Sequence, residues 1–260
     1  MTLLFDIGNT HTHLGLADAK RVRKQANIPS TSWRNGSATR LVKKFVGREP
    51  LEGTVVCSVV PSATPLVQQL ARSWKLPCLE LTPRTLSGIG IDYPKPNSIG
   101  PDRLANALAV NHYYGAPAVV VDFGTAVTFD VVDRKANYVG GIIAPGLAAM
   151  TEYLHEKTAL LPRIHIREVA AAIGRNTEEA MLIGAVHGYR GLVRELLKEL
   201  RLALHSKTLA VVATGGYAEL IAAKVPEITA VEPLLTLEGL RLLWERRHRT
   251  VLEPEQKEPP

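Results

Sequence analysis

One short pattern occurs twice in this chain and combines residue types that suit phosphate chemistry. Asp6 and Gly8 stand in the first copy, and Asp122 and Gly124 stand 116 positions later, each copy after a hydrophobic run. A glycine at a hairpin tip lets the backbone approach a ligand closely, and exposed N–H groups beside hydroxyl or amide side chains suit phosphate oxygens. The carboxylate at each strand end would hold a cation that offsets the phosphate charge. Either copy alone is better explained as a plain hairpin, but the repeat predicts two hairpins that grip a polyphosphate across a cleft.

A third glycine-containing turn lies further along the chain. Gly215 and Gly216 follow the hydrophobic run 209–214 and precede a predicted helix. Such a turn can pack against a flat nucleoside, although taken alone it is better explained as a tight strand-to-helix turn. Together with the paired hairpins, it completes a set of two phosphate elements and one adenosine element.

Strand and helix patterns alternate along the chain, which is typical of an α/β protein. We predict strands over 3–10, 12–18, 54–61, 118–133, 137–146 and 209–216, and helices over 64–74, 100–115, 176–200 and 237–249. Asn176 and Glu179 have the spacing of a capping box at the start of the longest helix. The repeat divides the chain into halves 1–115 and 116–250, and the charged, proline-rich residues 251–260 are expected to be disordered.

The composition is that of an ordinary globular protein, with 46% hydrophobic and 22% charged residues among 260. No hydrophobic run reaches 18 residues and Asp6 interrupts the first one, so we expect neither a membrane span nor a signal peptide and predict a cytoplasmic location. Cys57 and Cys78 lack metal-ligand spacing and are interpreted as reduced core thiols. The net charge of +6 comes from scattered basic residues without a nucleic-acid-binding motif. We therefore expect no nucleic acid, and phosphorylated or carboxylate metabolites as partners.

Seven segments, in family order across nearly the whole chain, resemble the type III pantothenate kinases. They are residues 6–16, 100–110, 119–132, 138–147, 173–181, 211–216 and 235–245. The resemblance implies the duplicated, ribonuclease-H-like α/β fold of actin, sugar kinases and chaperone ATPases, with two mixed five-stranded sheets flanked by helices and an ATP cleft between them. It also implies ATP-dependent phosphorylation of pantothenate to 4′-phosphopantothenate, the first step of coenzyme A synthesis. The expected state is a homodimer whose subunits share the substrate pocket.

The segment Gly-Pro-Asp-Arg at 100–103 contains the residue that the resemblance identifies as the general base, Asp102. An N-cap role is the alternative, because a helix is predicted to begin there. The two roles are compatible, since a helix N-terminus stabilises the ionised carboxylate that a base requires. Arg103 would bind the carboxylate or polar groups of pantothenate, with an ordinary surface arginine as the alternative.

The same resemblance implies the other site residues. ATP contacts are expected at Thr125, at the Gly215–Gly216 turn, and along Asp6, Ile7, Gly8, Asn9, Thr10, His11, Thr12 and His13. Magnesium that bridges the phosphates is expected near Asp6, and a monovalent cation, potassium or ammonium, at Asp122. Pantothenate contacts are expected at Tyr93, Gly100, Pro101, Asp102, Arg103 and Thr177.

Three positions depart from the family pattern, without removing a group that the mechanism needs. His11 replaces an asparagine, Pro101 an alanine and Arg175 a lysine. Proline is tolerated in the first turn of a helix. His11 and His13 have i, i+2 spacing, so a metal site is conceivable, but two strand residues on one face are the better interpretation without further Cys or His ligands.

Gly184, Gly188 and Gly191 lie on about one face of the longest predicted helix. Small residues at this spacing let another helix approach closely. The sequence alone favours packing within the subunit, whereas the dimers of the family favour a two-fold interface. A nucleotide-binding regulator is the alternative to an enzyme, because relatives have been described as accessory factors for transcription; the presence of Asp102 and Thr177 together with both hairpin aspartates favours the enzyme.

Overall fold

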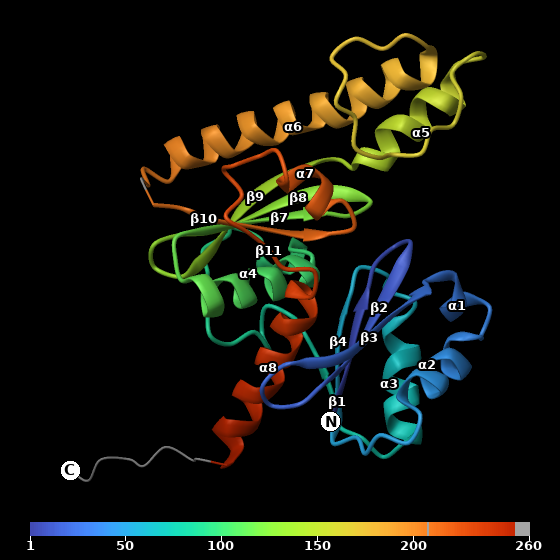
Figure 1. Cartoon of the computed structure of the whole chain (residues 1–260). Coiled ribbons are helices and arrows are strands. Elements are labelled where there is room, and N and C mark those ends of the chain that lie inside the picture. The colour runs from blue at the N-terminus through green and yellow to red at the C-terminus, as the bar shows by residue number, and fades with distance from the viewer. Residues whose placement is uncertain (207, 253–260) are drawn as a thin grey trace. The chain divides into compact units, whose positions relative to one another are not determined.

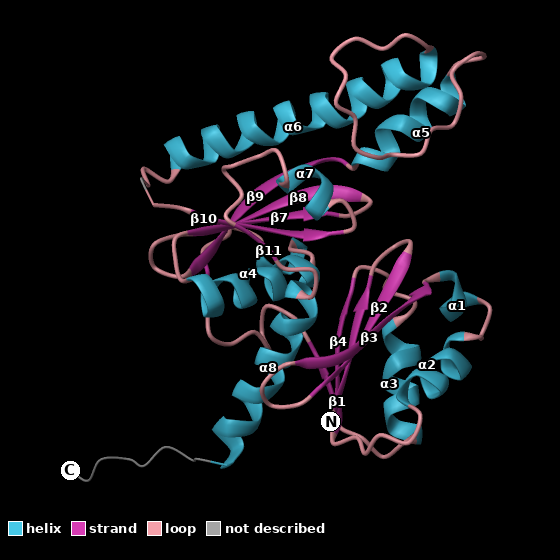
Figure 2. Cartoon of the chain, in the orientation of Figure 1, coloured by secondary structure: helices cyan, strands magenta, loops and turns pink. Residues whose placement is uncertain are grey.

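The computed structural model describes residues 1–206 and 208–252, which form two compact units. The first unit combines Met1–Tyr113 with the chain from Leu234 onward, and the second is Tyr114–Pro233. Each unit contains a mixed β-sheet covered by helices, as Figure 1 and Figure 2 show. Within the described residues, no helix combines the length and the hydrophobicity that a membrane crossing requires.

The first unit is built on a five-stranded sheet of order β3-β2-β1-β4-β5. Its strands are β1 (Thr2–Ile7), β2 (His11–Ala17), β3 (Val22–Pro29), β4 (Gly53–Ser58) and β5 (Cys78–Glu80). β1 pairs antiparallel with β2 and parallel with β4, which places the first Asp-x-Gly turn between two neighbouring strands. Alternate residues of β1 (Leu3, Phe5 and Ile7) enter the same core as the buried faces of α2 (Ala38–Val46) and α3 (Thr64–Ser73).

Shorter elements connect this sheet to the helix that carries Asp102. The one-turn helix α1 (Thr31–Arg34) follows β3. A two-residue strand, β6 (Gly90–Ile91), and a 3₁₀ turn, η1 (Pro96–Ser98), precede α4 (Pro101–Tyr114).

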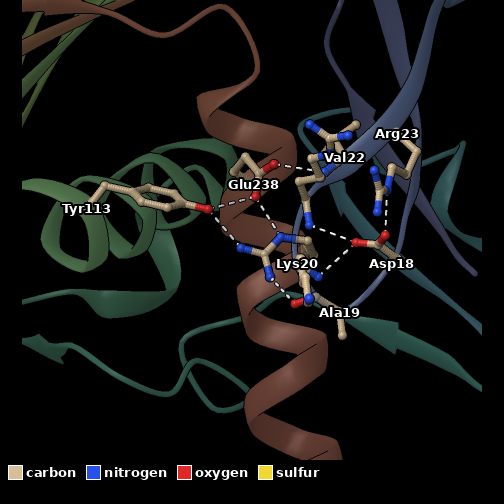
Figure 3. Close-up of polar contacts among 9 residues, drawn as sticks. Asp18, Ala19, Lys20, Val22, Arg23, Tyr113 and Glu238 are labelled. Atoms are coloured by element: carbon tan, nitrogen blue, oxygen red, sulfur yellow. Dashed lines mark hydrogen bonds and ion pairs between the residues drawn. The ribbon is translucent and has the colours of Figure 1, made fainter.

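The last helix, α8 (Leu235–Leu252), belongs to the first unit, although its residues were predicted to lie in the second half of the chain. Figure 3 shows the polar contacts that fasten it there. The Glu238 carboxylate accepts hydrogen bonds from the Val22 N–H and from the Tyr113 hydroxyl, both at 2.8 Å. The Arg241 guanidinium donates to the carbonyl of Ala19 at 2.9 Å. α8 therefore holds the β2–β3 hairpin and the end of α4 within one unit.

Hydrophobic packing also holds α8 against the sheet of the first unit. Leu237, Leu240 and Trp244 are buried, and the Trp244 ring lies so close to Gly53 on β4 that a side chain at position 53 would collide with it. The predicted boundary near residue 115 is close to the observed one, but the assignment of the helix was wrong, because a hydrophobic helix face does not say which sheet it covers. The helix includes the first two residues of the tail predicted to be disordered, and 253–260 lie outside the described residues.

The second unit repeats the arrangement of the first. It contributes β7 (Ala118–Phe123), β8 (Ala126–Val132), β9 (Asn137–Pro145), β10 (Ala210–Gly215) and β11 (Ala230–Val231). They lie in the order β11-β10-β7-β8-β9 within a sheet of six strands, so the prediction of five strands holds for the first sheet and was wrong for this one. β7 pairs antiparallel with β8 and parallel with β10, as β1 pairs with β2 and β4. The duplicated α/β fold predicted from the repeat is therefore confirmed.

Helices complete the second unit. The long α6 (Thr177–Ala203) covers one face of the sheet, where Tyr189 and Val193 share a core with Val119 and Val121 of β7. α5 (Leu147–Lys157) packs beside the first half of α6, and α7 (Ala218–Ala222) follows β10. Because side chains alternate along a strand, Asp122 lies on the face of β7 opposite to the one that α6 covers.

Candidate active site

The first Asp-x-Gly turn forms a tight β-hairpin between β1 and β2. The Gly8 N–H donates to the His11 carbonyl at 2.9 Å, and a side chain at Gly8 would come within 3.1 Å of the same oxygen. Asn9, Thr10 and His11 are exposed at the tip. Ile7 and Thr12, by contrast, are buried, so any contact that these two make with a ligand at the tip comes from their backbone.

Asp6 lies on β1, directly across from His13 on β2 and Cys57 on β4. The buried Cys57 thiol donates to Asp6 Oδ1 at 3.3 Å. The pKa of Asp6 is raised to about 7, chiefly by burial in the protein and secondly by the negative charge of Asp102, against the opposing effect of the thiol hydrogen bond. A carboxyl in this environment gains from a nearby cation, because a cation stabilises the ionised form.

Asp102 is the second residue of α4, which begins at Pro101, so it lies inside the first turn and does not cap the helix. Its Oδ1 accepts the backbone N–H of Arg103 at 2.9 Å. Desolvation by burial raises the pKa of Asp102, and the N–H and the charge of Arg103 partly oppose this effect. Gly100 leaves room for the carboxylate, since a side chain there would come within 2.5 Å of Asp102 Oδ1. Pro101 occupies the first helical position, where proline is tolerated.

The first unit therefore brings two carboxyl groups, Asp6 and Asp102, close enough for the charge of one to shift the pKa of the other. Arg103 is half-buried next to Asp102, and Tyr93 is 36% exposed in the segment between β6 and η1. His11 and His13 both lie on β2 as predicted, and His13 Nδ1 is 2.8 Å from Asn27 Oδ1 on β3.

The second Asp-x-Gly turn forms the equivalent hairpin between β7 and β8. The Gly124 N–H donates to the Ala126 carbonyl at 3.1 Å, and Thr125 is exposed at the tip. Asp122 lies across from Thr128 on β8 and from Thr214 on β10. A carboxylate between two hydroxyl-bearing residues offers only hard oxygen ligands, which alkali-metal and alkaline-earth cations prefer.

The Gly215–Gly216 turn follows β10 in the same unit. Gly215 has a φ of +89°, and a side chain at this position would lie 2.7 Å from Asp122 Oδ1. Both constraints require glycine at 215. Gly216 is exposed and has open space where a side chain would be. The second unit thus places Gly215 directly beside Asp122, at the start of the hairpin that carries Thr125.

Thr177 is exposed at the first position of α6. The predicted cap is present, because Asn176 Oδ1 accepts the Glu179 N–H at 2.8 Å. The Glu179 carboxylate accepts the N–H of Arg175 rather than that of the cap residue, so the capping box is displaced by one residue.

Thr177 also lines a groove of about 770 Å³ between α5 and α6, and most of the other lining residues are hydrophobic. Tyr153 and Met150 line the same groove and are 61% and 39% exposed. Side chains built at Gly184, Gly188 and Gly191 would meet no atom of the described residues within 4 Å. The prediction from the sequence alone, that these glycines pack against another helix of the same subunit, is therefore wrong for the described residues.

Sequence reasoning did not assign a site role to three residues that the structure places at the first hairpin: Ser30, Trp33 and Cys57. Ser30 donates from Oγ to the Gly8 carbonyl at 2.6 Å, and Trp33 Nε1 donates to Thr12 Oγ1 at 3.0 Å. Strand alternation offers the one available signal, because Thr12 stands at i, i+2 and i+4 spacing with the core residues Leu14 and Leu16. Nothing local in the sequence indicates which residues meet Thr12.

Comparison with protein families gives a match over most of the chain. The family model described as "Type III pantothenate kinase" matches residues 2–199. A protein of that description from Akkermansia muciniphila is 48% identical over 241 residues, which are 92% of this chain and 96% of the relative. Another from Methylacidiphilum infernorum is 43% identical over 247 residues, 94% of this chain and 88% of the relative.

Comparison with solved structures shows the fold. A Campylobacter jejuni protein described as a Baf family transcriptional activator superimposes with a TM-score of 0.63 at 19% identity, over 95% of this chain and 99% of its own. The activator of 2-hydroxyisocaproyl-CoA dehydratase from Clostridium difficile, solved with ADPNP bound, superimposes with a TM-score of 0.52 at 12% identity, over 100% and 99%. Both likenesses place the chain in the actin-like ATPase fold predicted above.

Proposed function

Since the chain belongs to the type III pantothenate kinase family, we propose that it transfers the γ-phosphate of ATP to the primary hydroxyl of pantothenate with Asp102 as the general base. The observation that carries this assignment is the pair of carboxyl groups in the first unit. Asp6 stands beside the first hairpin, and Asp102 acts on its pKa by charge. One carboxylate can thus face the nucleotide end of a substrate pair and the other the acceptor hydroxyl.

The chain's own residues have separable roles in this reaction. The Gly8–His11 tip and the Gly124–Thr125 tip offer backbone N–H groups to phosphate oxygens. The Gly215–Gly216 turn has open space at Gly216 for a flat nucleoside. Asp102 accepts the hydroxyl proton, and its raised pKa brings it closer to the operating pH, where a general base works best.

The donor sets fit the two cations that the family resemblance implies. Asp6 would hold magnesium together with ATP phosphates, because magnesium keeps few carboxylate ligands and takes the rest from phosphate and water. Asp122, between Thr128 and Thr214, would hold potassium or ammonium. When bound, these cations neutralise the charge that develops on the transferring phosphoryl group.

Pantothenate would be bound by the segment around Asp102. Arg103 offers a guanidinium for its carboxylate. Tyr93, Gly100 and Pro101 complete the part of the pocket contributed by the first unit. Thr177 would join a pocket shared between two subunits, because it lines the hydrophobic α5–α6 groove.

A second copy of the chain is the occupant that we propose for this groove. Side chains built at the α6 glycines would meet no atom outside their own helix within 4 Å among the described residues, and hydrophobic side chains beside these glycines are exposed. A symmetric helix pair would cover both, since small residues let helices approach closely. Size-exclusion chromatography with light scattering should give a dimer for the wild type and a monomer for Gly184→Glu.

The activity is tested by ATP turnover measured with purified protein in the presence and absence of pantothenate. We expect ADP release that requires pantothenate and rises when potassium replaces sodium. Sugar acceptors serve as the specificity control. A correctly folded protein that binds ATP but releases no ADP with pantothenate would overturn the proposal and favour a nucleotide-binding regulator.

A further inference from the structure

We propose that Trp33, Thr12 and Ser30 form a directional hydrogen-bond relay that orients the first hairpin for phosphate binding. The inference rests on the proposed function, because it assigns the relay to the ATP site. All three side chains are at most 5% exposed, so none of them can contact the nucleotide directly. They would act as positioning residues through the backbone of the hairpin.

Donor and acceptor counting fixes the direction of the relay. The Trp33 indole can only donate, and it does so to Thr12 Oγ1 at 3.0 Å. The Gly8 carbonyl can only accept, and it receives the single hydroxyl hydrogen of Ser30 at 2.6 Å. The hydroxyl oxygens of Thr12 and Ser30 are 3.1 Å apart. Because the Ser30 hydrogen is already used, Thr12 must donate to Ser30 in this contact.

Ser30 holds the hairpin at two points. Its hydroxyl binds the Gly8 carbonyl, and its backbone N–H donates to the Thr10 carbonyl at 3.0 Å. These two carbonyls belong to alternate residues of the turn. Both are therefore pulled toward β3 and α1, the elements between which Ser30 lies.

Peptide geometry converts this anchoring into an orientation of N–H groups. In a planar trans peptide the C=O and the following N–H point in opposite directions. Because the Gly8 carbonyl points toward Ser30, the Asn9 N–H points away from Ser30. The Thr10 carbonyl also points toward Ser30, so the His11 N–H points away from Ser30 as well. The tip then presents two N–H groups on its exposed side, the arrangement that binds phosphate oxygens. The relay ends at the Gly8 carbonyl oxygen, whose direction sets the orientation of the Asn9 N–H.

Trp33 stabilises the start of the relay by packing. Its ring makes an edge contact with Phe5 of β1, with centroids 6.0 Å apart. The indole N–H is therefore held in place by the core and not by the hairpin itself. A buried chain of this kind is rigid when every member is satisfied and costly when one is removed.

The decisive variants separate the hydroxyl from the packing. Thr12→Val keeps the shape of the side chain and removes the hydroxyl, whereas Thr12→Ser retains it. Thr12→Val removes both the hydrogen bond from Trp33 and the one to Ser30. We expect it to raise the Kd for Mg–ATP about threefold to tenfold, which corresponds to the net free energy of about one of these bonds, and Thr12→Ser to recover most of the affinity. The KM for pantothenate should stay at its wild-type value. Ser32→Ala is the matched control, because Ser32 is also buried and lies on α1 next to Trp33, and the hydrogen bonds of the relay do not involve it.

A second readout needs no nucleotide. The Ser30 amide, which donates to the Thr10 carbonyl, should exchange its hydrogen faster in Thr12→Val than in wild type, while the amides of β4 keep their rates. Wild-type exchange at Ser30 in Thr12→Val, together with wild-type ATP affinity, would overturn the relay. Failure of the wild-type protein to bind Mg–ATP would instead overturn the proposed function, and the exchange measurement would still decide whether the relay orders the hairpin.

Discussion

Replacing Asp6 with asparagine is expected to stabilise the metal-free protein at neutral pH. The pKa of this carboxyl is raised from 3.8 to about 7, chiefly because burial desolvates the charged form. In the unfolded chain the group ionises near 3.8, so the folded state holds a proton that the unfolded state has already released. A difference of about three pKa units at 1.36 kcal/mol each corresponds to about 4 kcal/mol.

The sign of the pH dependence follows from proton counting. Below pH 4 the carboxyl is protonated in both states and has no effect on the free energy of unfolding. Between pH 4 and 7 only the folded state holds the proton, so this free energy falls as pH rises, and above 7 the full loss remains. Asp6→Asn removes the titration and should therefore flatten the curve over this range. The gain at pH 7.5 should be of the order of 4 kcal/mol, less if the hairpin relaxes.

Urea unfolding monitored by circular dichroism, in EDTA and without nucleotide, measures both proteins at half-unit steps from pH 4 to 8. Asp18→Asn is the control of opposite sign, because N–H groups of Arg21 and Lys20 lower the pKa of Asp18 to about 2. Its stabilising effect is present above the unfolded pKa and is lost as pH falls, so this variant should be less stable than wild type at neutral pH. Parallel curves for wild type and Asp6→Asn would refute the reasoning.

Three further outcomes are expected. Asp102→Asn should keep the fold and lose about 10²–10⁴-fold in kcat, the usual contribution of a general base; near wild-type turnover in this variant would exclude Asp102 as the base. In the wild type, kcat should fall with decreasing pH around a pKa that lies above the ordinary aspartate value, because the Asp102 carboxylate becomes protonated. Gly215→Ala should lower the free energy of unfolding by about 1–3 kcal/mol, since alanine is strained at a φ of +89°. Urea unfolding measures this loss, with Gly216→Ala as the control variant. Thiol labelling should modify Cys78 before Cys57, because burial raises the pKa of both thiols but raises that of Cys57 well above its usual value; equal rates in single-serine variants would contradict this.

The sequence predicted the features that depend on local pattern and on the repeat. The spacing of 116 between Asp6 and Asp122 predicted two equivalent hairpins, and both lie at the end of a central strand with the same neighbours. The start of α6 was predicted at Asn176 because capping uses residues close in sequence. Such features are determined within a few residues, so a single sequence is sufficient to find them.

Features that depend on distant contacts were not predicted. Cys57 was interpreted as an inert core thiol, yet its hydrogen bond to Asp6 requires the register between β1 and β4, 51 residues apart. The partners of Thr12 require the packing of α1 against the hairpin. α8 could have covered either sheet on the basis of its hydrophobic face, and only contacts such as that of Glu238 with Val22, 216 residues apart, decide between them. Long-range register and packing are properties of the folded chain, which local periodicity does not encode.

The return of α8 to the first unit has a consequence for the order in which the protein is made. The second unit, Tyr114–Pro233, is one continuous segment, whereas the first unit includes Leu235–Leu252, the helix that the ribosome synthesises after all of it. Domains generally fold as they emerge during translation. The second unit can therefore fold before the first unit is complete. Until α8 is made, the face of the first sheet that Leu237 and Trp244 cover stays exposed. In this chain, the first unit is the first to be synthesised and the last to complete its fold.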